Sequence, residues 1–131
     1  MRTFVLVAAL AVGALSAGAA SAQQLLGEYY TLIGPRDFFN SSGTRLTNFC
    51  AIIQQDRANY HRFGVADPAD GWDPFFQDRA ARSRISQTCY TPPGNEYIRD
   101  FLLSGQTRYL WVRVYGAGGV ITAVEVREGA G

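Results

Sequence analysis

The spacing of apolar residues changes several times along this chain. Residues 4–15 form an almost unbroken apolar run. Residues 28–33 are rich in aromatic and β-branched side chains, residues 45–63 repeat apolar side chains at helical spacing, and the segments 109–115 and 120–127 alternate apolar with polar side chains. The pattern therefore predicts an apolar leader, a strand, a long helix and a C-terminal hairpin, in that order.

The apolar run belongs to a predicted N-terminal leader. Arg2 precedes it, and residues 20–22 (Ala-Ser-Ala) form a small-residue cleavage signal. The run is short and rich in Ala and Gly, whereas a membrane-spanning helix needs about 20 apolar residues. We therefore expect residues 1–22 to be a secretory signal peptide and residues 23–131 to form one small globular domain that is periplasmic or secreted.

Helices are expected between the first strand and the hairpin. The longest covers residues 45–63, with Thr44 as its N-cap and Gly64 as its C-cap. An Asp-Pro pair is typical of a helix N-cap followed by the first helical residue. Asp73 therefore predicts a second helix over residues 74–86.

The order of the elements predicts an α+β fold. A third helix is expected over residues 95–104, and Gly116–Gly119 forms the hairpin turn. The sequence thus gives β-α-α-α-β-β, with helices packed on one face of a small three-stranded antiparallel sheet. The pattern leaves open whether the first strand pairs with the hairpin. Each hairpin strand places its aliphatic residues on one face (Leu110, Val112 and Val114; Val120, Val124 and Val126).

Charge excludes two classes of partner. The full chain has 12 Arg, no Lys and 11 acidic residues. Cleavage after residue 22 would remove Arg2 and leave a neutral chain of 109 residues, the size of one ordinary domain. Because a neutral chain has no broad basic surface, we expect no nucleic-acid partner and no stable membrane insertion after cleavage. The expected partner is an envelope protein or a small ligand.

The chain contains two cysteines, Cys50 and Cys89. In an oxidising compartment such a pair favours one disulfide. Closing the loop of about 40 residues between them would contribute on the order of 3–4 kcal/mol. The alternatives are a reactive thiol or a metal pair, which lack the support of a Cys-x-x-Cys motif.

Asp56 has an unusual place in the long helix. It falls inside the apolar stripe, with Ile52 and Tyr60 one turn away on either side. A carboxylate that faces the core is costly unless it is paired or hydrogen-bonded. We therefore expect Asp56 to have a specific partner, such as one of the many arginines, for example on the second helix, or backbone N–H groups of a nearby loop.

The alternative for this helix is a catalytic or ligand-binding cleft. Asp56, Arg57, Tyr60 and His61 would form its floor, and Asp56 or His61 would act as a general base. Such a site would make the protein a small enzyme of hydrolase type. The sequence offers no evident nucleophile, so it leaves the reaction open.

Two further groups of residues are candidate binding sites. Asp67, Asp70 and Asp73 could bind calcium as the only cofactor, although their spacing does not match an EF-hand and Asp-Pro capping explains two of them. Tyr109, Trp111 and Arg113 share the hairpin face opposite the valines. If that face is open, it is an aromatic platform for a sugar, a peptide or a protein partner. If it is covered, these are core residues.

Residues 40–76 resemble a group of small uncharacterised exported proteins of Gram-negative bacteria. The resemblance rests on residues 40–43 with Arg45 and Leu46, on residues 55–64, and on the Asp-rich stretch that ends at Phe76. It implies a periplasmic home and no particular activity. The leading hypothesis is a non-enzymatic binding or accessory domain of the cell envelope. The enzyme and a calcium-stabilised module are the alternatives.

Overall fold

The computed structural model describes residues 22–130, which adopt an α+β fold. Apart from Ala22, the predicted signal peptide lies outside the described residues. The elements in chain order are β1 (Gln24–Ile33), the 3₁₀-helix η1 (Pro35–Phe38), α1 (Phe49–Ala58), the π-helical turn η2 (Asn59–Phe63), α2 (Arg79–Thr88), β2 (Cys89–Tyr90), α3 (Tyr97–Leu103), β3 (Arg108–Ala117) and β4 (Val120–Glu128).

The strands form one mixed sheet in the order β1-β3-β4-β2. β1 pairs antiparallel with β3, and β3 pairs antiparallel with β4. The predicted three-stranded antiparallel sheet is therefore incomplete, because β2 adds a fourth strand parallel to β4. β2 has only two residues, which is too short to show an alternating pattern in the sequence.

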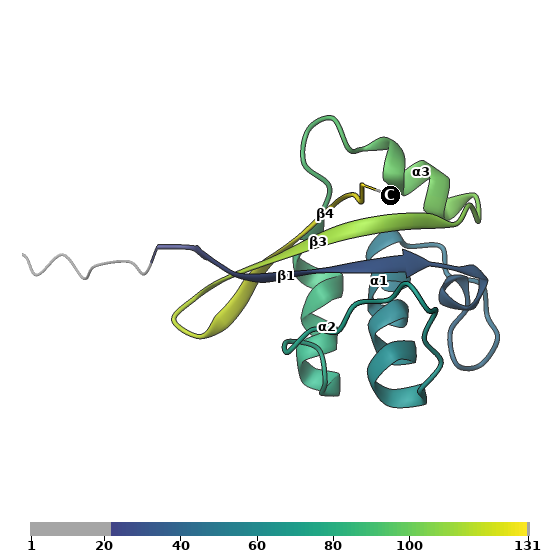
Figure 1. The fold of residues 1–131 in the computed structure, drawn as a ribbon, viewed down its shortest axis with the longest axis horizontal. Coiled ribbons are helices and arrows are strands. Elements are labelled where there is room, and N and C mark those ends of the chain that lie inside the picture. Colours follow the sequence, from purple (N-terminus) through teal and green to yellow (C-terminus); the bar gives the residue numbers. More distant parts are fainter. Residues whose placement is uncertain (1–21, 131) are drawn as a thin grey trace, which may run out of the picture.

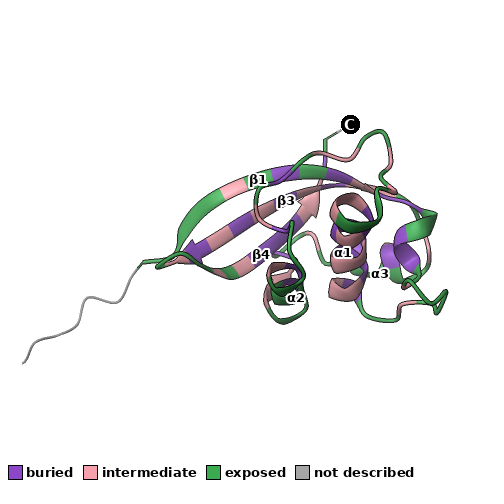
Figure 2. Ribbon diagram, turned by 90° about the horizontal axis from the view of Figure 1, so that it is seen from below, coloured by how far each residue is buried: buried purple, intermediate pink, exposed green. Residues whose placement is uncertain are grey.

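The helices and the sheet form two layers. α1 and α2 lie side by side against one face of the sheet, and α3 lies at the end where β1 stops and β3 begins (Figures 1 and 2). Within residues 22–130, no helix covers the centre of the opposite face (Figure 1). We call this opposite face the open face. Its side chains include Glu28, Tyr30, Leu32, Tyr109, Trp111, Arg113, Tyr115, Ala123, Glu125 and Arg127.

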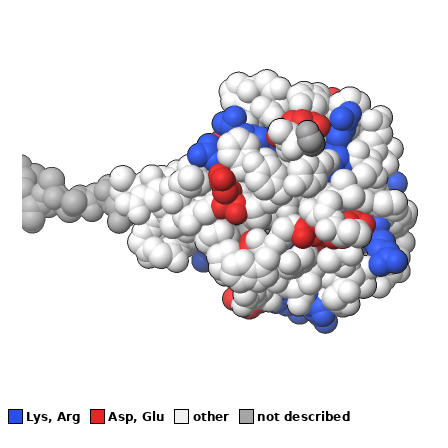
Figure 3. All heavy atoms as spheres, viewed as in Figure 1, with Lys and Arg blue, Asp and Glu red and all other residues white. Residues whose placement is uncertain are grey.

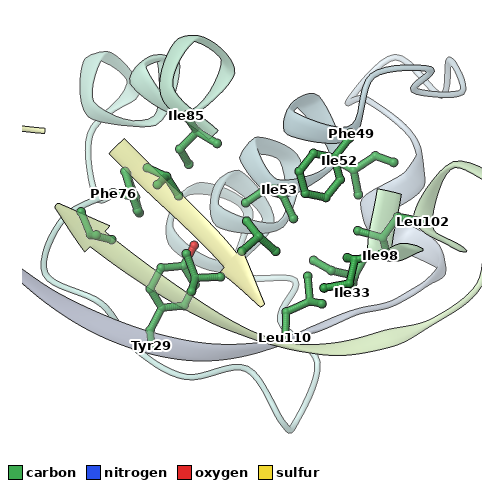
Figure 4. Close-up of a cluster of buried hydrophobic side chains, with 14 of the residues drawn as sticks. Tyr29, Ile33, Phe49, Ile52, Ile53, Phe76, Ile85, Ile98, Leu102 and Leu110 are labelled. Carbon is green, nitrogen blue, oxygen red and sulfur yellow. The ribbon is translucent and has the colours of Figure 1, made fainter. Parts of the chain in front are cut away.

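The core lies between the sheet and the helices (Figure 4). The prediction that Leu110, Val112 and Val114 share one face is confirmed, since all three are fully buried. Burying an aliphatic side chain of this size contributes about 1.5–3 kcal/mol. The core also takes in residues of β1, α1, α2, α3, β4 and the segment before α2 (Tyr29, Ile33, Phe49, Ile52, Ile53, Phe76, Ile85, Ile98, Leu102, Val124 and Val126).

Val120 is the exception to the predicted aliphatic face. Val124 and Val126 are fully buried, but Val120 is 45% exposed. The register between β3 and β4 shifts between Tyr115 and Gly116. A one-residue shift turns the following side chains to the other face of a strand. The strict alternation assumed in the sequence therefore fails at this irregularity.

The long helix begins later than predicted. Its N-cap is Asn48, whose side chain accepts a hydrogen bond from the Ala51 N–H at 3.2 Å. Arg45, the predicted start, instead pairs with Phe39 in an isolated β-bridge. The predicted end is confirmed: η2 continues α1 to Phe63, and Gly64 follows with φ +61°, a conformation that favours glycine.

The second helix also begins later than predicted. Its N-cap is Asp78, which accepts from the Ala81 N–H at 2.8 Å. Asp73 forms only a cap-like turn, in which its Oδ1 accepts from the N–H groups of Phe75 and Phe76 at 2.8 and 2.7 Å. The chain then leaves this turn, and Phe76 enters the core. None of the helices formed by residues 22–130 is both long and apolar enough to span a bilayer.

Candidate functional site

A buried ionic cluster surrounds Arg57 at the end of α1. The guanidinium donates through Nε to Asp56 Oδ2 at 2.7 Å, and through Nη1 to Asp73 Oδ2 at 2.8 Å and the Gly71 carbonyl at 2.9 Å. Nη2 donates to Thr31 Oγ1 at 2.8 Å. Arg57 therefore joins α1 to β1 and to the loop before α2. We call these five residues, together with His61, the Arg57 cluster.

Two tyrosine rings also contact the guanidinium. The Arg57 Cζ atom lies 4.3 Å from the ring centroid of Tyr29 and 4.7 Å from that of Tyr60. A cation near an aromatic face gains up to about 2 kcal/mol when both are desolvated. Arg57 thus has hydrogen-bond acceptors and aromatic rings around it, and its side chain is fully buried.

Asp56 has the specific partner that its position predicts. It is fully buried, and its two oxygens accept from Thr31 Oγ1 at 2.8 Å and from Arg57. The prediction of an arginine partner is confirmed, but that arginine is not on the second helix: Arg82, the buried arginine of α2, donates to the carbonyls of Phe76 and Gln77. The adjacent residue in α1 takes this role instead.

The two carboxylates of the cluster differ in acidity. Burial raises the pKa of Asp56 to about 7, against the opposing effect of Arg57. Burial also acts on Asp73, but hydrogen bonds from His61 and Arg57 outweigh it and hold its pKa below the ordinary value. One guanidinium therefore serves two carboxylates, and the additional hydrogen bonds from His61 and the Phe76 N–H distinguish Asp73 from Asp56.

His61 completes the cluster from η2. Its Nε2 lies 2.7 Å from Asp73 Oδ2, and its ring lies edge-on to Tyr60 with centroids 4.9 Å apart. The π-helical turn that carries His61 also carries Asn59, which donates to Asp37 Oδ1 at 2.8 Å. The sequence did not reveal the roles of Thr31 and Asp73. The Asp-Pro motif offered a simpler explanation for Asp73.

The cluster offers little access for a substrate. Asp56 is fully buried, and the His61 side chain is only 7% exposed. Along residues 22–130, a hollow of about 420 Å³ lies between the start of α2 and the hairpin tip, and one of about 260 Å³ lies beside Phe39 and Phe63. Neither hollow is lined by Asp56 or His61. The geometry favours a structural role for these residues.

Two of the three aspartates of the predicted calcium site have carboxylates that are engaged in other contacts. Asp70 accepts from the Leu32 N–H at 2.9 Å and from the Asp67 N–H at 2.9 Å, and Asp73 belongs to the Arg57 cluster. In the described part of the chain, no three His, Cys, Asp or Glu side chains are placed to hold a metal ion. The calcium hypothesis gains no support from this geometry.

The two cysteines lie next to each other but are not bonded. Cys50 on α1 and Cys89 on β2 are both partly buried thiols, and Cys50 Sγ lies 3.2 Å from the Cys89 carbonyl oxygen. A hydrogen bond with the Cys89 thiol lowers the pKa of Cys50. The helix layer and the sheet layer therefore meet at two sulfurs that an oxidising compartment could join.

We expect the protein purified from an oxidising compartment to contain this disulfide. Thiol titration of the unfolded protein should then find no free thiol before reduction and two after it. Reduction should lower the melting temperature by roughly 10–20 °C, because the bridge restricts the unfolded chain. Cys50→Ser should melt like the reduced protein. Two titratable thiols in the protein as purified would contradict the disulfide.

The open face carries three aromatic rings in nearly parallel planes. The ring centroid of Tyr30 lies 5.7 Å from that of Tyr109 and 6.2 Å from that of Trp111, with interplanar angles of 16° and 9°. Tyr30 is 39% exposed, and the other two rings are partly buried. The sequence predicted Tyr109 and Trp111 here but missed Tyr30. Its alternation with the buried Tyr29 and Thr31 was the available signal.

Charged side chains lie in a row beside these rings. Arg113 lies between Glu28 and Glu125, with ion-pair distances of 3.7 Å to each, and Arg127 also pairs with Glu125. The Arg113 and Arg127 guanidinium carbons lie 5.1 and 5.9 Å from the Trp111 ring centroid. In the view of Figure 3, acidic and basic side chains are interspersed, and neither sign forms an extended patch.

The structure places the predicted site residues in two separate regions. Asp56, Arg57, Tyr60 and His61 lie together around the buried guanidinium, whereas Tyr109, Trp111 and Arg113 lie on the open face. Comparisons of this chain with protein-family models, with curated proteins and with solved structures found no match. The resemblance of residues 40–76 to small exported proteins therefore stays a prediction.

Proposed function

We propose that this protein is an exported, non-enzymatic binding domain of the cell envelope, and that its ligand contacts the open face. The observation that carries the proposal is the group of three rings formed by Tyr30, Tyr109 and Trp111. The solvent face of an antiparallel sheet is ordinarily polar. Aromatic residues are enriched in binding surfaces because they supply a large contact area with little conformational freedom to lose.

The arrangement of the open face favours binding over packing within the chain. Tyr30 lies on β1 and stays 39% exposed beside two other rings. An exposed apolar group with a polar rim is typical of an interaction site. Here the rim is the row of Glu28, Arg113 and Glu125 at the edge of the rings, in which Arg113 forms an ion pair with each glutamate.

The buried cluster supports a stable scaffold for this face. Thr31 of β1 accepts from Arg57, and the adjacent Tyr30 points to the opposite side of the same strand. β1, which carries the most exposed of the three rings, is therefore held in place on its buried side by the Arg57 cluster. A rigid scaffold reduces the entropy lost on binding.

The proposal predicts that binding depends on Tyr30. A printed panel of glycans and peptides should contain ligands that the wild-type protein retains and that Tyr30→Thr retains about tenfold less, since an aromatic contact is worth up to about 1.5 kcal/mol. Trp72→Thr is the matched control, because Trp72 is a 61% exposed aromatic residue of the loop before α2. Melting curves establish that each variant is folded.

Two outcomes would contradict the proposed function. One is a panel on which the wild-type protein retains nothing. The other is equal retention by the wild type, Tyr30→Thr and Trp111→Thr, which would place the binding surface elsewhere.

A further inference from the structure

We infer that the ligand of the open face is a neutral carbohydrate. This inference rests on the proposed function and names the chemical class of its ligand. It follows from three properties of the face: its balanced charges, the unpaired hydrogen-bond donor of Trp111 and its protected strand edges.

The charges of the open face cancel locally. Arg113 has a carboxylate on each side, from Glu28 and Glu125, and Arg127 pairs with Glu125 as well. An anionic ligand would have to displace these carboxylates, and a cationic ligand would have to displace the arginines. An uncharged ligand disturbs neither set of pairs, so the electrostatics of this face favour it.

One hydrogen-bond donor of this face lacks an acceptor. Trp111 Nε1 is buried and has no hydrogen-bond partner among the described residues, whereas Arg113 Nε faces Glu28 Oε2 at 3.7 Å. A buried donor without an acceptor destabilises the structure that contains it. A ligand hydroxyl that reaches Trp111 Nε1 would supply the missing acceptor.

A sugar hydroxyl matches this mixture of groups because it both donates and accepts. Its oxygen can accept from Trp111 or Arg113, while its proton is donated to Glu28 or Glu125. The row Tyr30–Trp111–Arg127 lies about 6.6–6.8 Å along the strands from the row Glu28–Arg113–Glu125. A sugar ring that rests on Tyr30 therefore brings its hydroxyl groups toward the charged row.

Contacts within the chain block strand addition by a peptide along the middle of β1 and of β4. The outer edge of β1 is occupied where the Gly71 N–H donates to the Tyr30 carbonyl at 2.7 Å and the Leu32 N–H donates to Asp70 Oδ1 at 2.9 Å. The outer edge of β4 is occupied by β2 at Val124 and Glu125. A peptide that binds as an added strand needs a free edge, and β2, which forms the other edge of the sheet, has only two residues. The face itself, and not its edges, is therefore the contact surface.

Titrations with defined oligosaccharides test the inference. Trp72 and Trp111 are the two tryptophans of the chain, so the Trp72→Phe protein reports on Trp111 alone. Chitohexaose or cellohexaose should change its fluorescence, with an affinity that varies less than about twofold between 50 and 500 mM NaCl, because a neutral ligand releases no counterions. A sulfated heparin oligosaccharide and a cationic peptide are the comparison ligands.

Variants measure the contribution of the Tyr30 ring and that of the charged row to binding separately. Tyr30→Thr should weaken binding of the neutral oligosaccharide about tenfold, and Tyr30→Phe should restore it, since the ring is kept. Glu28→Gln should weaken it by a smaller factor. Phe39→Thr is the control, because Phe39 is an exposed aromatic residue outside the sheet.

The possible failures are distinguishable. If a peptide or a sulfated glycan binds in a Tyr30-dependent way while no neutral glycan on the printed panel binds, the carbohydrate inference is overturned and the proposed function stands. If a neutral oligosaccharide binds equally well to the wild type and to Tyr30→Thr, both are overturned. The carbohydrate inference and the proposed function are also both overturned if no ligand of any class binds.

Discussion

Replacing Arg57 by methionine should destabilise the domain by about 3–5 kcal/mol, the cost of breaking a buried ion pair on one side. The change leaves the carboxylates of Asp56 and Asp73 buried without their shared cation, and it removes the donor to the Gly71 carbonyl. Domains of this size have a total stability of only 5–15 kcal/mol. Urea unfolding of the wild type and the variant measures the difference.

Arg62→Met is the control for this substitution. Arg62 lies five residues further along the same helical segment and is exposed. Its replacement should change the free energy of unfolding by less than about 0.5 kcal/mol. An Arg57→Met protein within 1 kcal/mol of the wild type would show that the cluster does not hold β1, α1 and the following loop together.

The domain should be more stable at pH 5.5 than at pH 8, by about 2 kcal/mol from Asp56 alone. The pKa of Asp56 rises from its ordinary value near 3.8 to about 7 on folding, so the folded state binds a proton more tightly than the unfolded state. Stability is therefore lost as the pH rises through 7. Burial also raises the pKa of Asp37, to about 6, which adds a smaller effect of the same sign.

Asp56→Asn tests the origin of this pH dependence. The amide can accept from Arg57 and cannot ionise, so the stability of the variant should vary by less than about 1 kcal/mol between pH 5.5 and pH 8. Chemical unfolding at both pH values gives the comparison. A wild-type protein that gains stability toward pH 8 would contradict the raised pKa. Asp73 acts in the opposite sense, but only at lower pH, because its pKa is depressed.

The sequence predicted those parts of the fold that repeat a regular pattern. The alternation of Leu110, Val112 and Val114 located the buried face of β3, and the turn at Gly64 located the end of the long helical segment. The starts of α1 and α2 were wrong, because several residues near each start can serve as an N-cap. Tertiary contacts at Phe39 and Phe76 decide between them, and a local pattern does not contain these contacts.

The candidate site was predictable to a similar degree. Asp56 stood out because a carboxylate on an apolar stripe requires a partner. Its partner, Arg57, could not be chosen from sequence because the chain has many arginines and no lysine. Tyr30 escaped notice for a different reason. Its contribution depends on the pairing of β1 with β3, which the pattern left open.

The loop before α2 lacks regular secondary structure, yet it is fixed as firmly as an edge strand. The Gly71 N–H bonds to β1, its carbonyl bonds to Arg57, and a side chain at this position would meet the Tyr30 carbonyl oxygen at 2.7 Å. The loop therefore opens only when α1 and β1 separate, which makes it part of the global cooperative unit and protects its amides from hydrogen exchange. Surface loops usually tolerate insertions, but an insertion in this loop would unfold the whole domain. The exposed turn at residues 41–44 lacks hydrogen bonds of this kind to β1 and Arg57, so it should accept an insertion.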